Sequence, residues 1–151
     1  MSERERIVDQ LKRALDGPAW HGPALLEVLD GVTAAQAARR PIPGAHSIWE
    51  IVLHIAVWED VVRRRALGEK VEVTPAQDWP AVADASEAAW HRAVEALEAS
   101  NAALRGVVDA FDERRLDQPL VPGGNAGYIQ FHGAVQHDLY HAGQIAVLKK
   151  G

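Results

Sequence analysis

Two histidines near the C-terminal end of the sequence have the spacing of a metal chelate. In the run His137-Asp138-Leu139-Tyr140-His141 the two imidazoles are four residues apart. On an α-helix, side chains with this spacing lie on one face, with Cβ atoms about 5–6 Å apart, so both rings can reach one ion. Ala134, Ile145 and Leu148 fall on the same face, which predicts that both rings point into the protein interior.

His54 is the third candidate ligand. Ile51 lies one helical turn before it and Trp58 one turn after it, so His54 also belongs to an apolar face. Burial disfavours a charged imidazole, and histidines that converge in a core would be neutral or would share a cation. Two readings stay open from the residues alone. One is a metal site, and the other is a set of core histidines that each make one hydrogen bond, because an H-x-x-x-H pair also arises by chance.

Composition excludes several classes of function. The formal net charge of -5 disfavours a nucleic-acid partner, because binding to phosphate backbones needs a dense surface of Lys and Arg. The chain has no cysteine, which excludes disulfides, thiolate ligands and a cysteine nucleophile. Any thiol chemistry must therefore use a thiol from another molecule. The charged N-terminus and the lack of a long apolar run predict a cytoplasmic protein without a membrane partner.

The pattern of apolar residues predicts one all-α domain over residues 1–151. Apolar residues recur at helical spacing over 7–29, with Gly-Pro pairs at 17–18 and 22–23 that indicate one kinked helix or two stacked pieces. A short helical turn is expected after Thr33. A capping box at Ser47 starts the best-marked helix, which should stop at Gly68.

The second half of the chain completes the bundle. A connection containing Pro75 and Pro80 should carry the chain across the bundle, and a capping box at Asp84 should start a long helix that continues through Val108. A last, mostly apolar helix is expected over 127–149. The segment 71–74 is isolated and ends at a proline, so no sheet is predicted and four helices are the economical answer.

Several of these residues carry a resemblance to a known family. The segment from Ser47 to His54, the ending from His137 to Ile145 and the distance between them resemble the DinB/YfiT-like superfamily, and the resemblance covers nearly the whole chain. It implies an up-down-down-up four-helix bundle with one long crossover. It also implies a divalent metal held by one histidine on the second helix and an H-x-x-x-H pair on the fourth, which His54, His137 and His141 match one for one.

The other candidate residues have two readings each. Glu50 and Asp138 could accept the free ring N–H of a ligating histidine, or Glu50 could only complete a helix cap and Asp138 could be solvated. Trp20 and His21 could line the mouth of a pocket. The remaining histidines, His46, His91 and His132, are expected at the surface or near the site rather than as ligands.

The tryptophans and arginines of the second helix have simpler explanations. Trp49 and Trp58 should fill the core or a dimer interface, and with the family resemblance they predict a homodimer. The run 63–65 of three arginines is explained as a solvated helix end that complements the helix dipole.

A metal with three neutral imidazole ligands keeps at least one open coordination position, and zinc or nickel are the expected ions. The metal could activate water, which requires a nearby general base, or it could bind a small-molecule thiol as thiolate. Several members of the family are thiol S-transferases or mycothiol-dependent isomerases. The sequence is therefore interpreted as a metal-dependent transferase that uses a low-molecular-weight thiol and a small-molecule substrate. The alternatives are a metal-dependent hydrolase and a non-enzymatic metal- or ligand-binding module.

Overall fold

The computed structural model describes all 151 residues and contains helices but no strand. The only β-type pairings are isolated bridges at Ala19–Gly22 and Pro119–Ala126. None of the helices combines the length and the hydropathy of a membrane-spanning segment. In chain order the helices are α1 Glu3–Asp16, α2 Leu25–Leu29, α3 Ala34–Ala38, α4 Ile48–Ala66, α5 Pro75–Asp78, α6 Glu87–Asp109, the 3-10 helix η1 Glu113–Arg115, and α7 Gly127–Leu148.

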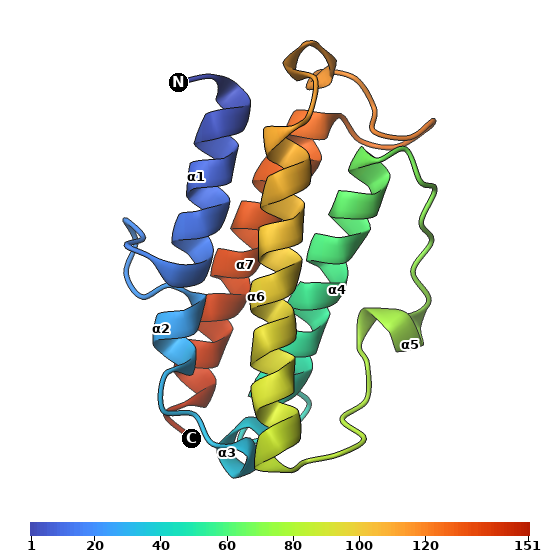
Figure 1. Cartoon of the computed structure of the whole chain (residues 1–151). Helices are drawn as coiled ribbons and strands as arrows, with labels where there is room; N and C mark the ends of the chain where they lie inside the picture. Colours follow the sequence, from blue (N-terminus) through green and yellow to red (C-terminus); the bar gives the residue numbers. More distant parts are fainter.

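Helices α1, α4, α6 and α7 pack into a bundle, as the apolar pattern predicted. Each of them contacts two of the others, in the circular order α1, α6, α4, α7. In Figure 1, α1 and α7 run from the upper to the lower end of the bundle, and α4 and α6 run from the lower to the upper end. The segment 67–86 returns the chain along the outside of α4, and it carries α5.

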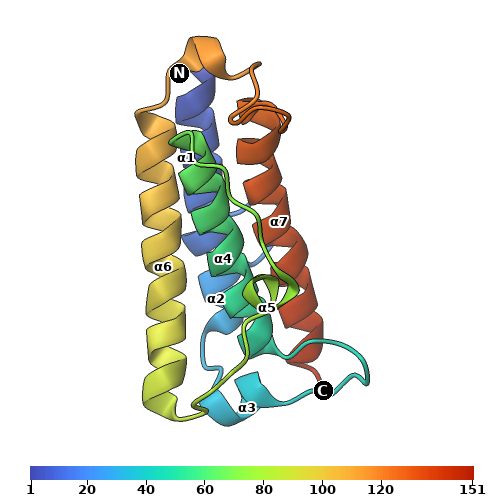
Figure 2. The same ribbon diagram turned by 90° about the vertical axis from the view of Figure 1, so that its right-hand side faces the viewer.

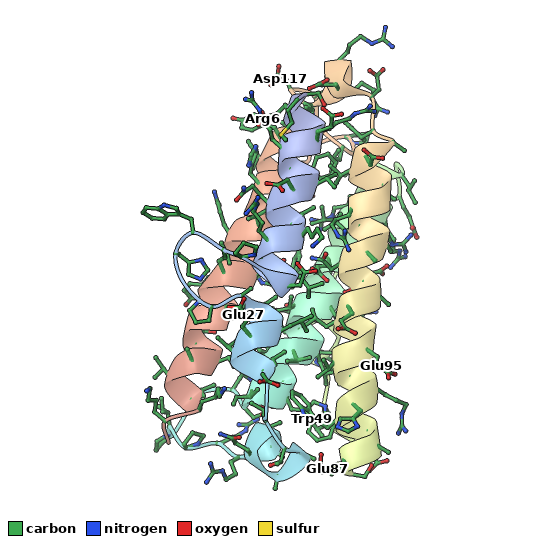
Figure 3. All side chains as sticks on the ribbon, turned by 60° about the vertical axis from the view of Figure 1, so that its left-hand side comes forward. Arg6, Glu27, Trp49, Glu87, Glu95 and Asp117 are labelled. Carbon is green, nitrogen blue, oxygen red and sulfur yellow. The ribbon has the colours of Figure 1, made fainter.

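Two apolar clusters form the core. The cluster at the lower end of the bundle includes Trp49, Ile55, Trp90 and Leu97, and the cluster at the upper end is built around residues such as Phe131. Figure 3 shows Trp49 at the lower end, between α4 and α6. Its ring centroid lies 5.2 Å from that of Trp90, and only 3% of Trp49 is exposed. Trp49 is thus a core residue and offers no surface for a dimer interface. The homodimer itself stays a prediction.

A polar layer crosses the bundle and involves all four of its helices. Asn101 of α6 donates from Nδ2 to the main-chain oxygen of Leu11 at 3.3 Å and to Oε1 of Glu59 at 2.9 Å. The hydroxyl of Ser100 donates to the other carboxyl oxygen of Glu59. Asp138 of α7 lies fully buried beside this layer, but neither of its carboxylate oxygens has a hydrogen-bond partner. Buried polar groups are costly unless they are paired, so the bonds among Asn101, Ser100 and Glu59 fix the register of α6 against α4.

Helix starts follow the predicted capping chemistry with one shift. At Ser47 the complete capping box is present, because the hydroxyl accepts from the Glu50 amide and the Glu50 carboxylate accepts from the Ser47 amide. Helix α6 begins later than the predicted box at Asp84. Its N-cap is Ser86, and Asp84 instead accepts a hydrogen bond from the Ser86 amide. Asp and Ser are both good N-caps, and here the Asp84 carboxylate is bonded to the amide two residues on, which leaves the cap to Ser86.

Two local details differ from, or refine, the sequence interpretation. The apolar run 7–29 forms two separate helices, α1 and α2, rather than one kinked helix. The crossover contains a helical turn, α5, that the apolar pattern did not predict. Thr74 caps it and Pro75 occupies its first position, where a missing N–H costs nothing.

Candidate metal centre

The three predicted histidines come together between α4 and α7. His54 on α4 is 6% exposed, His141 on α7 is 5% exposed, and His137 is partly buried one turn before His141. Their ring nitrogens form a group in which one atom from each residue lies within 4.8 Å of the others. These residues meet because α4 packs against α7. The sequence alone did not reveal that these two helices are neighbours.

The same type of nitrogen faces the centre of this group in each residue. Nε2 of His137 lies 3.0 Å from Nε2 of His54 and 3.1 Å from Nε2 of His141. Ligand nitrogens that surround one ion at about 2.0–2.1 Å lie about 3 Å apart, so the separations fit a common metal.

The crossover fixes the orientation of His54. Its Nδ1 lies 2.8 Å from the main-chain oxygen of Asp78 and 3.1 Å from the carboxylate oxygen Oδ1 of the same residue. Because these oxygens only accept, Nδ1 carries the proton and the lone pair is on Nε2. Trp58 donates from its indole N–H to Oδ1 of Asp78 at 2.7 Å, which holds this carboxylate beside the ring.

Gln144 has the same role for His141. Its side-chain oxygen Oε1 accepts from Nδ1 of His141 at 2.6 Å, so the lone pair of His141 is again on Nε2. Hydrogen bonds of this kind accompany almost every metal-ligating histidine, because they set the tautomer and the ring direction. Two of the three imidazoles are therefore held with a free lone pair toward the same point.

Electrostatics favour the neutral forms of His137 and His141. Burial and the neighbouring rings of His141 and His54 lower the pKa of His137 to about 3. Burial also lowers the pKa of His141. If neutral His137 carries its proton on Nε2, it can donate one hydrogen bond, to Nε2 of either His54 or His141. The nitrogen lone pair of the other histidine then has no donor. A shared divalent cation would satisfy the lone pairs of all three histidines, and the donor set therefore fits a metal ion.

Aromatic stacking joins the crossover to the histidines. The ring of Trp79 lies between those of His46 and His54, with centroid distances of 3.5 and 3.8 Å and interplanar angles of 5° and 2°. Figure 2 shows α5, which immediately precedes Trp79, in front of the boundary between α4 and α7. The crossover thus covers one side of the histidine group.

Glu50 and Asp138 do not accept a hydrogen bond from any of the three rings. Glu50 completes the helix cap and also pairs with Arg40, which is the simpler of its two predicted roles. Asp138 is fully buried and faces Glu59 instead of water. Burial raises the pKa of Glu59 to about 7, and burial followed by the charge of Glu59 raises the pKa of Asp138. Ser100 and Asn101 donate hydrogen bonds to Glu59, whereas neither carboxylate oxygen of Asp138 has a hydrogen-bond partner.

The remaining sequence candidates lie in other environments. Trp20 is fully exposed in the loop after α1, and neither it nor His21 lines a pocket at the histidine group, so that suggestion was wrong. His91 is exposed on α6. His132 pairs with Glu3 at 2.8 Å. His46 is close to the site through its stack on Trp79.

The fold and the site together define a class: an all-helical bundle with a buried group of three histidines that could hold a metal ion. Residues 19–145 match the family model described as the DinB superfamily, and the chain belongs to that family. No curated protein and no solved structure matches the chain.

Proposed function

We propose that this protein is a metal-dependent transferase that joins a low-molecular-weight thiol to a small electrophilic substrate, with His54, His137 and His141 as the metal ligands. The observation that carries the proposal is the convergence of three Nε2 atoms, two of them held with free lone pairs. A divalent ion bound there would hold a thiol as thiolate at neutral pH.

The thiol must come from a cosubstrate, because the chain has no cysteine. In the overall reaction the thiol loses its proton, a bond forms between sulfur and the electrophilic carbon, and the leaving group departs with that proton. The protein's own contribution is orientation. Asp78 and Gln144 fix two ligand rings, and Trp79 covers the ring face of His54.

The carboxylates around the site favour thiol transfer over hydrolysis. A hydrolase needs a general base within reach of the water that it activates. Asp138 is buried against Glu59, and Glu50 is engaged by Arg40 and the helix cap. Asp78 contacts the Nδ1 side of His54, away from the Nε2 atoms. Transfer of a thiol does not require such a base.

The test is conjugation of small thiols with a panel of electrophiles, combined with metal analysis. We expect activity in the metal-loaded protein, none after metal removal, and none in His54→Ala. The matched control is His91→Ala, an exposed histidine on α6 that should retain both metal and activity. Activity that survives metal removal would contradict the proposal. Ester or amide hydrolysis without conjugation would identify a hydrolase, and bound metal without either activity would identify a binding module.

A further inference from the structure

Two hollows lie along the boundary of α4 and α7, one on each side of the histidine group. The first, which we name the apolar hollow, measures about 580 Å³, and its walls include Ile51, Trp79, Tyr140, His141, Gly143 and Val147. The second, the polar hollow, measures about 260 Å³, and its walls include Trp58, Arg65, Gln130, Gly133, His137 and Asp138. Each hollow thus contains one of the paired histidines of α7.

A glycine of α7 lies in the wall of each hollow. A Cβ atom at Gly143 or at Gly133 would meet nothing within 4 Å, and neither residue has a positive φ. Backbone conformation and crowding therefore do not require glycine at either position. Glycine in a helix interior destabilises the helix relative to alanine. What these two residues provide is open space where a side chain would otherwise project.

The walls of the apolar hollow select against charge. No Asp, Glu, Lys or Arg side chain lines it, and the residues with polar side-chain groups in its walls are His46, Trp79, Tyr140, His141 and Gln144. In the metal-free protein, a charged molecule that entered would lose its hydration without gaining an ion pair from these walls. Three of the exposed large hydrophobic side chains of the protein, Ile42, Tyr140 and Val147, lie together in this wall and are 44%, 66% and 60% exposed. An apolar ligand would cover them.

The size and position of the apolar hollow fit a small organic molecule. Its volume is within the range of small-molecule sites, about 300–1,000 Å³. His141 belongs both to this wall and to the histidine group, so a molecule in the hollow would lie next to the proposed metal ion.

We infer that the apolar hollow binds the electrophilic substrate as an uncharged aromatic or alkyl compound, and that Gly143 keeps the space for it. This inference rests on the proposed function for the identity of the occupant. The binding specificity itself depends only on the walls of the hollow and can be measured without catalysis.

The experiment uses two fluorescent probes that differ by one charged group. N-phenyl-1-naphthylamine is uncharged, and 8-anilinonaphthalene-1-sulfonate adds a sulfonate to the same ring system. Binding of each is measured by fluorescence titration of the full chain, with and without zinc. We expect the uncharged probe to bind at least tenfold more tightly than the sulfonate in the zinc-free protein, and this ratio should fall when zinc, whose charge attracts the sulfonate, is bound. Equal affinity in the zinc-free protein, or no binding of the uncharged probe, would overturn the inference.

Variants locate the binding site of the probe. Gly143→Phe should weaken binding of the uncharged probe at least tenfold, Gly143→Ala should change it less than threefold, and Gly133→Phe is the matched control that fills the polar hollow and should leave binding unchanged. Val147→Arg tests the same wall from an exposed position, where folding is not at risk. It should weaken binding of the uncharged probe and strengthen that of the sulfonate. Equal effects of Gly143→Phe and Gly133→Phe would overturn the assignment.

Kinetics separate this inference from the proposed function. In an active protein, Gly143→Phe should raise KM for the electrophile at least tenfold and leave KM for the thiol within threefold. If both KM values rose together, Gly143 would not select the electrophile. Probe binding as described above, without any conjugation activity, would support the hollow and contradict the transferase.

Discussion

The imidazole Nδ1 of His54 lies 2.8 Å from the main-chain oxygen of Asp78, so a residue of the crossover sets the tautomer of a histidine on α4. The crossover is more than a connection between helices, because it also supplies Trp79 against the same ring.

Metal should stabilise the fold. A ligand that binds only the folded state adds about 2.7 kcal/mol at a hundredfold excess over its dissociation constant, so chelation at pH 7.5 should lower the melting temperature by roughly 5–10 °C. Scanning calorimetry of zinc-loaded and chelator-treated protein measures this shift. His54→Ala should show no chelator-dependent change, whereas His91→Ala should behave as the parent chain. Identical melting curves for loaded and stripped parent chain would count against a metal in the fold.

Gln144 should tune metal affinity without being a ligand. Because its Oε1 accepts from Nδ1 of His141, Gln144→Leu removes the group that directs this ring. Loss of such a hydrogen bond typically costs 10- to 100-fold in metal affinity, and we expect a weakening of about tenfold or more. Competition with a chromophoric chelator measures the dissociation constant. Gln10→Leu, at an exposed position of α1, is the control. Equal affinities of the two variants would show that the hydrogen bond does not matter.

His137 should make the metal-free protein less stable in acid. Its folded pKa of about 3 is below the ordinary value of 6.5, so between these pH values the unfolded chain binds a proton that the folded chain does not. Stability is therefore lost as the pH falls through this window, by at most about 1.4 kcal/mol per pH unit for this proton. Urea unfolding in chelator from pH 7 to 5 should show a steeper loss in the parent chain than in His137→Gln. Parallel curves would refute the assignment.

The buried carboxyl pair should act in the opposite direction. Burial raises the pKa of both Glu59 and Asp138, so the folded chain keeps protons that the unfolded chain releases above about pH 4. These retained protons stabilise the folded chain at low pH. Their contribution is lost as the pH rises from about 4 through the pKa of about 7 for Glu59. Asp138→Asn removes one of the two acidic groups and, with it, the charge repulsion between Glu59 and Asp138.

The stability of Asp138→Asn relative to the parent chain should therefore increase from pH 5 to pH 8, by at most about 1.4 kcal/mol per pH unit. Urea unfolding in chelator gives the difference at each pH. Asp117→Asn, an exposed position, should show no such trend. A constant difference between Asp138→Asn and the parent chain over this range would show that burial does not raise the pKa values of these two carboxyl groups.

Local chemistry explains why much of the fold could be predicted from sequence. The apolar faces, the Ser47 capping box and the prolines are short-range signals, and they gave the helices of the bundle. The three histidines were identified by spacing, apolar neighbours and resemblance to a family. The start of α6 was placed two residues early because Asp84 and Ser86 both offer a cap. Helix α5 was missed because it has no apolar periodicity, although Thr74 and Gln77 form a capping box around Pro75.

The partners of the histidines were harder to predict. Gln144 is three residues after His141 on the same helix, so its position could have been recognised from spacing. Asp78 and Trp79 could not, because they come from an irregular segment whose contact with α4 depends on how the whole chain folds. The approach of Asp138 to Glu59 likewise depends on the packing of α7 against α4.

The central claim is that His54, His137 and His141 hold one divalent ion. The most direct test is a crystal structure of protein loaded with zinc or nickel, with anomalous scattering recorded at the absorption edge of the metal. The account predicts a single strong anomalous peak between α4 and α7, with the three Nε2 atoms about 2.0–2.2 Å from it. No peak at this position, or a peak whose ligands do not include all three histidines, would contradict it.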